Sequence, residues 1–402
     1  MIYRQLQKHF DKLPVAFPAA RSGSDIKVLK HLFNEEEAEI ALSLGYEYQS
    51  AEKVFDKISA KLPVTYENLA DKLRAMAAKG CIFVRYTDGG EEYALVPLMI
   101  GMFELQGPRL SLGLLKDFVK YLEDGFGFEY LSNKPQQMRV IPIEKSVNVK
   151  NRIPSYEDIE ALIESSQGGL SVVDCICKKS WDLYEKPCKV TDKREVCLAF
   201  GEMSEYCVKH DFGRRISKDE ALSLMRSLQE AGLVLQTTGE QDVQVVCACC
   251  RCCCGVLKLY SQLPSPRDFV ASNHIVEFRS ELCKTCGLCA KRCSMRAIHF
   301  DQKRAEISIN LNKCIGCGVC VPVCKSGALR LKDKETWEVP PITTKDLYDE
   351  IGKNRNEYFS KVKMILKLLL TLKKDTVKKR RLHYPGNKKR MPFAFPAKIA
   401  WP

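Results

Sequence analysis

The sequence predicts a multidomain α+β protein, and three features support this fold class. The N-terminal part shows helical spacing of apolar residues followed by a hairpin pattern. All of the 20 cysteines except Cys81 lie between Cys175 and Cys324. The residues that make the chain basic gather at its C-terminal end. In chain order, we expect an N-terminal helical domain with a hairpin over 1–130, a linker over 131–153, a cysteine-rich α/β metal-binding module over 154–274, a compact domain built on a repeated cysteine motif over 275–335, and a basic, amphipathic, extended tail over 336–402.

The net charge of +13 belongs to the tail alone. Residues 351–402 contain 15 Lys and Arg against Glu357 and Asp375, so this segment accounts for the whole excess. The other 350 residues keep 48 of the 63 basic and 48 of the 50 acidic groups. The charge therefore does not indicate a nucleic-acid-binding surface on the folded part.

Cysteine usage indicates a reducing compartment. The chain starts Met1-Ile-Tyr-Arg-Gln, which is not a secretory signal, and it contains no uninterrupted apolar run long enough to span a bilayer. Tandem cysteines in such a chain favour metal ligation over disulfides. We expect a cytoplasmic protein, peripheral on the inner face of the membrane where the basic tail attaches it.

The N-terminal unit reads as three helices and a hairpin. Asn34, with Glu37 three residues on, predicts the start of the first helix. Apolar residues at helical spacing continue through Val54 and Ile58, and then from Leu69 to a stop at Gly80. Two strands over 81–86 and 91–96 flank a glycine turn. This order predicts a winged-helix-like domain.

Such a unit either binds DNA or docks onto a protein. The helix over 66–79 offers Lys72, Arg74 and Lys79 to phosphates, but Asp71 lies among them and the hairpin is acidic. We favour docking, so nucleic acid is not an expected partner.

The middle module begins with a helix for which Ser155 is the expected N-cap, and a strand over 170–173 leads to Cys175. The capping box of Ser217 and Glu220 predicts another helix, which ends at Gly232. The first cysteine group of this module could hold one cubane iron–sulfur cluster or one zinc ion. We favour iron–sulfur, since a further cluster would extend an electron relay. These residues are Cys175, Cys177, Cys188 and Cys197.

A second group places six cysteines within eight residues. Adjacent cysteines rarely meet the geometry of a disulfide, so this run also predicts metal ligands. The pattern leaves open which of them ligate, whether one site combines cysteines of both groups, and whether an open iron position there is catalytic. These residues are Cys247, Cys249, Cys250, Cys252, Cys253 and Cys254.

The spacing CxxCxxCxxxC occurs twice in the C-terminal third, and it is typical of two 4Fe-4S clusters. Three thiolates on a tight loop reach three irons of one cubane, and the fourth ligates the other cluster. Zinc ribbons do not need this third and fourth cysteine. The crossed pattern assigns Cys283, Cys286, Cys289 and Cys324 to one cluster, and Cys314, Cys317, Cys320 and Cys293 to the second.

On these motifs, residues 275–332 resemble a bacterial-type dicluster ferredoxin domain. The resemblance implies a ferredoxin-like fold with short strands at 297–300 and 328–331. Ser294 and Lys325 stand where that family usually has proline. The order of all features over about 1–335 resembles a multidomain family of 4Fe-4S-binding proteins of anaerobes, which implies electron transfer and says little about substrate.

We therefore expect an iron–sulfur protein that relays electrons through at least two 4Fe-4S clusters to or from a partner redox enzyme. No nucleotide-binding glycine loop, flavin motif or nucleophile–His–acid set is visible, so it reads as an electron-transfer component of an oxidoreductase system. Two alternatives stay open. One is a redox-sensing DNA-binding regulator, and the other is a reductase with a catalytic cluster at the Cys247–Cys254 run.

The tail predicts attachment to an anionic membrane surface or to an acidic subunit through residues 351–402. The alternative is a helix that packs on the protein's own core. Large aliphatic residues recur there at helical spacing between lysines, and basic clusters follow over 378–390. The aliphatic residues are Val362, Ile365, Leu366, Leu369 and Leu372.

Overall fold

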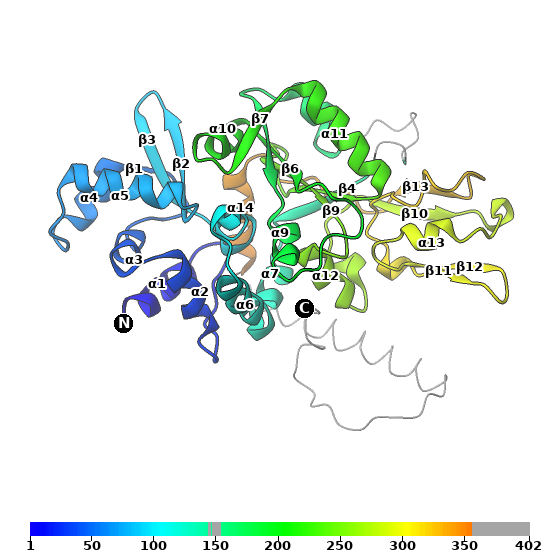
Figure 1. Cartoon of the computed structure of the whole chain (residues 1–402), viewed down its shortest axis with the longest axis horizontal. Coiled ribbons are helices and arrows are strands. Elements are labelled where there is room, and N and C mark those ends of the chain that lie inside the picture. Colours follow the sequence, from blue (N-terminus) through cyan, green and yellow to red (C-terminus); the bar gives the residue numbers. More distant parts are fainter. Residues whose placement is uncertain (144–145, 147–153, 356–402) are drawn as a thin grey trace.

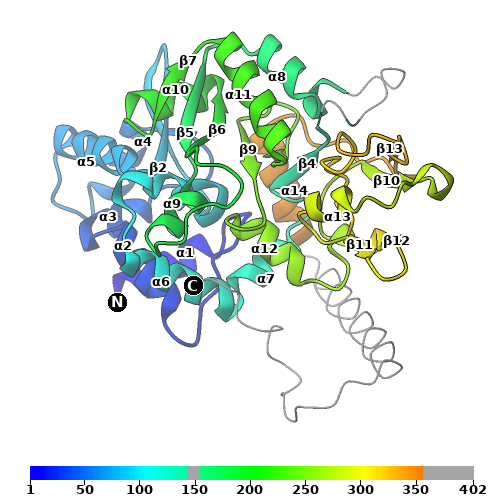
Figure 2. The same ribbon diagram turned by 45° about the vertical axis from the view of Figure 1, so that its right-hand side comes forward.

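The computed structural model describes residues 1–143, 146 and 154–355. Along the longest axis of the molecule lie the N-terminal helical unit, a central sheet with its helices, and a small domain at 274–333 (Figure 1). The view turned by 45° keeps this order (Figure 2). The cysteine-rich centre therefore lies between the two other parts.

The N-terminal unit contains the predicted helices and hairpin. Asn34 caps α3 as expected, because its side chain accepts a 2.8 Å hydrogen bond from the Glu37 N–H and the Glu37 carboxylate accepts a 2.9 Å bond from the Asn34 N–H. A short strand, β1, adds to the hairpin in the order β1-β3-β2. The elements are α1 (Ile2–Phe10), α2 (Ser24–Leu32), α3 (Glu35–Ala41), β1 (Gln49–Ser50), α4 (Ala51–Ile58), α5 (Tyr66–Ala78), β2 (Ile82–Thr87) and β3 (Gly90–Leu95).

The hairpin and α5 are tied to the central part rather than left free. The Tyr206 hydroxyl of α10 donates to the carbonyls of Ala77 (2.8 Å) and Ile82 (3.1 Å). Short 3-10 and π segments over 98–109 lead to α6 (Leu112–Tyr121) and α7 (Gly127–Ser132), and the Phe103 and Phe118 rings stack there. One continuous hydrophobic core joins the N-terminal unit to the central sheet.

The central sheet has six antiparallel strands in the order β4-β8-β9-β6-β5-β7. Ser217 caps α11 as expected, accepting from the Glu220 N–H at 3.1 Å, and Gly232 ends that helix in the left-handed region. The elements are β4 (Met138–Ile141), α8 (Ile159–Ser165), β5 (Leu170–Asp174), α9 (Ile176–Asp182), β6 (Glu195–Phe200), α10 (Gly201–Lys209), β7 (Gly213–Ile216), α11 (Lys218–Ala231), β8 (Val234–Thr238), β9 (Val245–Cys249) and α12 (Gly255–Gln262).

Two local expectations differ from the structure. The interval 131–153, expected to be a linker, contains β4, which pairs with β8 at one edge of the sheet. Pro135 and Pro142 flank this four-residue strand, and an edge position tolerates such prolines.

Ser155 was the wrong cap for the next helix: it starts a 3-10 turn, and Asp158 caps α8 by accepting from the Ala161 N–H at 3.2 Å.

The interval 336–402 begins as part of the folded body. Helix α14 (Thr344–Arg355) buries Leu347 and Ile351 next to Val15, and the Arg355 guanidinium pairs with Asp11 at 3.2 Å. The predicted amphipathic helix and basic clusters of the tail lie outside the described residues. None of the helices in the described ranges is both long and apolar enough to cross a membrane.

Candidate metal centres

The domain at 274–333 is built from two halves. Strand β10 (His274–Phe278) pairs with β13 (Leu329–Asp333), β11 (Ile298–Asp301) pairs with β12 (Glu306–Ile309), and helix α13 (Leu288–Arg292) precedes Cys293. Gly316 and Gly318 both have left-handed φ, of 72° and 74°. A Cβ at Gly316 would lie 2.2 Å from the His274 carbonyl oxygen, so only glycine lets this cysteine loop lie so close to β10.

The eight cysteines of this domain come from both halves, and thiols of one half interact with thiols of the other. Burial raises the pKa of the Cys289 thiol, and the negative charge of Cys324, Cys286 and Cys283 raises it further. Burial also raises the pKa of Cys317, as do Cys293 and Cys314. Thiols of the two halves therefore lie near one another, and Cys289 also raises the pKa of Cys320.

Backbone amides point at these sulfur atoms. The Thr285 N–H donates to the Cys283 sulfur at 3.4 Å, and the Ala297 N–H donates to the Cys293 sulfur at 3.2 Å. Such bonds stabilise thiolates, which are the form that ligates iron. A set of four thiolates per group, with amide donors around them, fits a 4Fe-4S cluster.

The cysteines of this domain differ in exposure. Cys286 is exposed, whereas Cys293 and Cys317 contact the core of the central part. From α13, the Arg292 guanidinium donates to the carbonyls of Ala231 (3.0 Å), Gln229 and Glu230 at the end of α11. Cys286 thus lies toward solvent, whereas Cys293 and Cys317 lie toward the cysteine-rich centre.

The upstream cysteines form other groups than the two expected from the sequence. Cys188 does not join Cys175, Cys177 and Cys197, but lies with Cys250, Cys252 and Cys253, all four sulfur atoms within 4.8 Å of one another. The sulfur of Cys188 is 3.5 Å from that of Cys250 and 3.7 Å from that of Cys252. The chain therefore combines cysteines of both groups, which the sequence left open.

Lys178 and Trp181 lie beside this four-thiol site, where the Trp181 indole N–H donates to the Cys253 carbonyl at 3.1 Å, and no motif in the sequence marked them. The Lys178 ammonium, 1% exposed, donates to Cys188 at 3.2 Å and to Cys250 at 3.4 Å. Burial acts to lower the pKa of Lys178, but the charges of Cys250 and Cys175 and the bond to Cys188 more than offset it, so the net shift is upward. A buried cation thus balances part of the thiolate charge.

The remaining six cysteines form a closed ring. Cys197 on β6 faces Cys247 on β9, and Cys249 lies two residues farther along the same strand. Cys175 and Cys254 are the N-cap residues of α9 and α12, and Cys177 lies in the first turn of α9. Each sulfur interacts with two others, in the order Cys175, Cys177, Cys254, Cys249, Cys247, Cys197 and back to Cys175.

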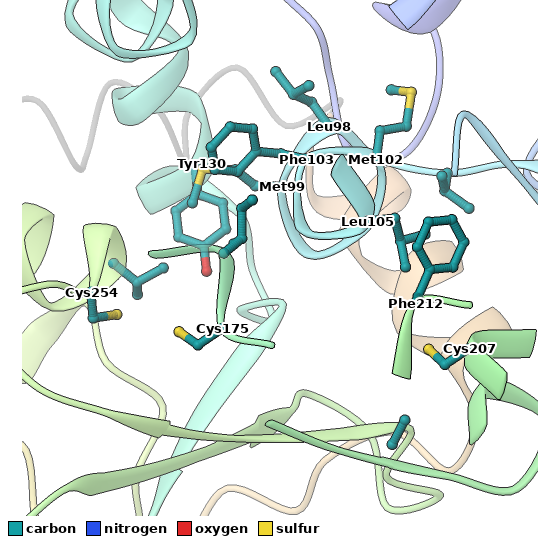
Figure 3. Packing of buried hydrophobic residues seen from close by; sticks show 14 of the residues in the cluster. Leu98, Met99, Met102, Phe103, Leu105, Tyr130, Cys175, Cys207, Phe212 and Cys254 are labelled. Atoms are coloured by element: carbon teal, nitrogen blue, oxygen red, sulfur yellow. The ribbon is translucent and has the colours of Figure 1, made fainter. Parts of the chain in front are cut away.

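All six line a cavity of about 1170 Å³. In Figure 3 the sulfur atoms of Cys175 and Cys254 point toward one another below the Tyr130 ring. The Tyr130 hydroxyl is buried and has no hydrogen-bond partner among the described residues. Glu104 lines the same cavity, and burial raises its pKa to about 7. The ring thus faces a cavity with polar groups around it.

Residues 282–334 match the family of 4Fe-4S dicluster domains. A stretch of 67 residues is 28% identical to an archaeal-type glutamate synthase [NADPH] of Dehalococcoides mccartyi. The match covers 17% of this chain and 13% of that protein, so it is a distant and partial similarity. No solved structure matches the chain. The C-terminal cysteine repeat is therefore a 4Fe-4S dicluster domain, which implies two clusters.

Proposed function

We propose that this chain is an electron-transfer protein in which the dicluster domain connects an external redox partner with the metal sites of the central module. Two 4Fe-4S clusters held by the eight cysteines would each take up and release one electron. The observation that carries the proposal is the orientation of the two groups, with Cys286 exposed and Cys293 and Cys317 against the central core. Electrons would enter or leave on the Cys286 side.

The surface around Cys286 suits an acidic partner. Leu282 and Leu288 are exposed on the same cysteine loop, together with the exposed Lys284 and Lys291. Apolar residues ringed by cations are typical of a transient docking face, and the cations would steer an acidic protein toward it. We propose a partner redox enzyme or subunit with a complementary acidic patch, in a reducing cytoplasm of an anaerobe.

The function predicts charge-dependent electron uptake. With the anaerobically reconstituted full chain and an acidic reduced ferredoxin or flavodoxin as donor, Lys284→Glu should slow cluster reduction about tenfold at low salt, because steering is lost. Lys303→Glu, in the β11–β12 turn, is the matched control. Stopped-flow absorbance measures the rate. A chain whose clusters cannot be reversibly reduced would contradict the proposal.

The four-thiol site supports a mononuclear metal ion. A tetrahedral ion with metal–sulfur bonds of about 2.3 Å keeps its thiolates about 3.8 Å apart. The separations at Cys188 and its neighbours, 3.1 to 3.7 Å, are of this size. A cubane spreads four thiolates over four different irons and so needs a wider set. We propose zinc or a single iron here.

We propose a winged-helix-like docking module for the N-terminal unit rather than a DNA-binding one. The cations that a DNA complex would need are used inside the protein: Lys72 pairs with Glu36 at 2.9 Å and Arg74 with Glu91 at 2.7 Å. Lys79 is likewise paired, with Glu37. This disfavours the regulator as an alternative.

For the tail we propose attachment to an anionic membrane face. Deleting residues 356–402, which leaves α14 in place, should abolish co-sedimentation with phosphatidylserine vesicles and leave the iron content unchanged. Each lysine near an anionic leaflet contributes about 1 kcal/mol, so raising the salt should release the full chain as well. Neutral vesicles are the control. Binding that survives the deletion would refute the attachment, and binding only to an acidic protein would indicate a subunit interface.

A further inference from the structure

The six-thiol ring is a second site in the central module, distinct from the four-thiol site. It takes Cys175, Cys177 and Cys197 from the first cysteine group and Cys247, Cys249 and Cys254 from the second. Four secondary-structure elements or their caps deliver these sulfur atoms to one place. Their convergence is therefore a property of the fold and not of one flexible loop.

The width of the ring decides what it can hold. Among the described residues, only the four-thiol group brings three or more potential metal-ligand atoms of His, Cys, Asp or Glu within 4.8 Å of one another. In the ring, each sulfur reaches its two neighbours but no three gather that closely. A single tetrahedral ion, or two ions sharing two thiolates, would need sets of thiolates about 3.8 Å apart. The ring is too wide for either.

Disulfides fit the arrangement poorly. Three disulfides would pair the six sulfur atoms into three short contacts, whereas here each sulfur has two neighbours of the same kind. The structure records all of these cysteines as free. The compartment expected from the cysteine usage also keeps thiols reduced.

We propose that the ring holds a polynuclear iron–sulfur cluster, with inorganic sulfide filling the space between the irons. Sulfide bridges are what allow thiolates to be spread around several metals instead of one. The adjoining cavity offers the volume, and the six thiolates exceed the four that a cubane uses.

Polar groups around the ring are arranged to meet such a cluster. The Tyr130 hydroxyl, buried and without a partner among the described residues, lies over Cys175 and Cys254 (Figure 3). The Leu257 N–H donates to the Cys254 sulfur at 3.5 Å, and the Gln236 amide lies 3.8 Å from it. An orphaned donor that faces sulfur would be satisfied by a thiolate or sulfide of the cluster.

Acid-labile sulfide tests the proposal, because a mononuclear site contains none. After anaerobic reconstitution the full chain should hold more than the roughly eight irons and eight sulfides of two cubanes. The double variant Cys247→Ser/Cys249→Ser should lose the surplus iron and sulfide together. The matched control Cys252→Ser/Cys253→Ser, in the four-thiol site, should keep the full sulfide content. The dicluster signals remain in both, so failure here is distinguishable from failure of the electron-transfer function.

Two results would overturn it without any variant: a wild-type sulfide content no higher than two cubanes explain, or disulfides among the six cysteines in anaerobic protein. Tyr130→Phe gives a test that spares every ligand. It should leave iron and sulfide unchanged but shift the EPR or Mössbauer signature of the surplus cluster, because one donor to sulfur is removed. An unchanged signature would contradict the placement of the cluster beneath Tyr130.

Discussion

Replacing Cys293 with serine should remove about four of the eight irons of the dicluster domain, and the lost cluster should be the one facing the central module. The other thiols of that cluster, Cys314, Cys317 and Cys320, lie on the second repeat, about two dozen residues away in sequence. Burial raises the pKa of Cys317 and Cys320, and the negative charge of Cys293 raises both further. Because one cluster loses one of its four ligands and the other cluster keeps all of its ligands, about half of the iron should be lost.

The measurement is iron content together with EPR of the dithionite-reduced chain, in which the interaction between two nearby clusters should disappear. Cys207→Ala is the matched control, because Cys207 is buried on α10 and away from both cluster groups. Loss of the Cys283, Cys286, Cys289 cluster instead would show that each repeat holds its own cluster.

Replacing Glu157 with leucine should lower the free energy of unfolding by about 3–5 kcal/mol, because it leaves a buried cation without its partner. Glu157 is fully buried and accepts bonds from Arg139 (2.8 Å), Asn273 (2.8 Å) and His274 (2.9 Å). Arg139 belongs to β4, and Asn273 and His274 lead into β10. The carboxylate thus joins the central sheet to the dicluster domain.

Urea unfolding followed by fluorescence checks this, since the Trp337 ring lies edge-on to His274 with centroids 5.7 Å apart. The control is Glu160→Gln, which removes a partly exposed ion pair with Arg226 and should cost less than about 1 kcal/mol. Equal effects of the two substitutions would contradict the importance of the buried network.

The same network makes stability depend on pH. Burial acts to raise the pKa of Glu157, but the bonds from His274 and Arg139 more than offset it, so the net pKa lies below its ordinary value. A carboxyl with a depressed folded-state pKa contributes stability above its unfolded pKa of about 4.3 and loses it as pH falls through the lower folded value. The wild type should therefore weaken more than the leucine variant does as the pH falls below about 4.3.

The sequence was most informative where spacing alone encodes the chemistry. The caps at Asn34 and Ser217 are confirmed because capping is a contact between residues three apart. The dicluster repeat was readable for the same reason, since three of the four cysteines in each repeat share one loop. Local patterns of this kind need no knowledge of the rest of the fold.

Contacts between distant segments could not be read this way. The pairing of Cys188 with Cys250 depends on a loop and the end of β9 meeting 62 residues apart. Likewise, β4 lies between two prolines and is a strand because it pairs with β8, while its Arg139 side chain binds Glu157. Cys247 and Cys249 belong to one site, and Cys250 and Cys252 to the other. This division follows from strand β9 ending at Cys249, which no local propensity marks.

The hydrogen bonds from Arg292 to the end of α11 bear on how fast electrons could move inside the molecule. Gly232 makes these hydrogen bonds possible, because a Cβ there would lie 2.4 Å from the Arg292 Nε. Together with the Glu157 network, these bonds fix the dicluster domain to the central part of the molecule at two separate points. The domain is thus not a swinging carrier that must tumble between donor and acceptor. Solvent viscosity should slow only the encounter with the outside partner, while transfer from the inner cluster onward should depend on distance and driving force alone.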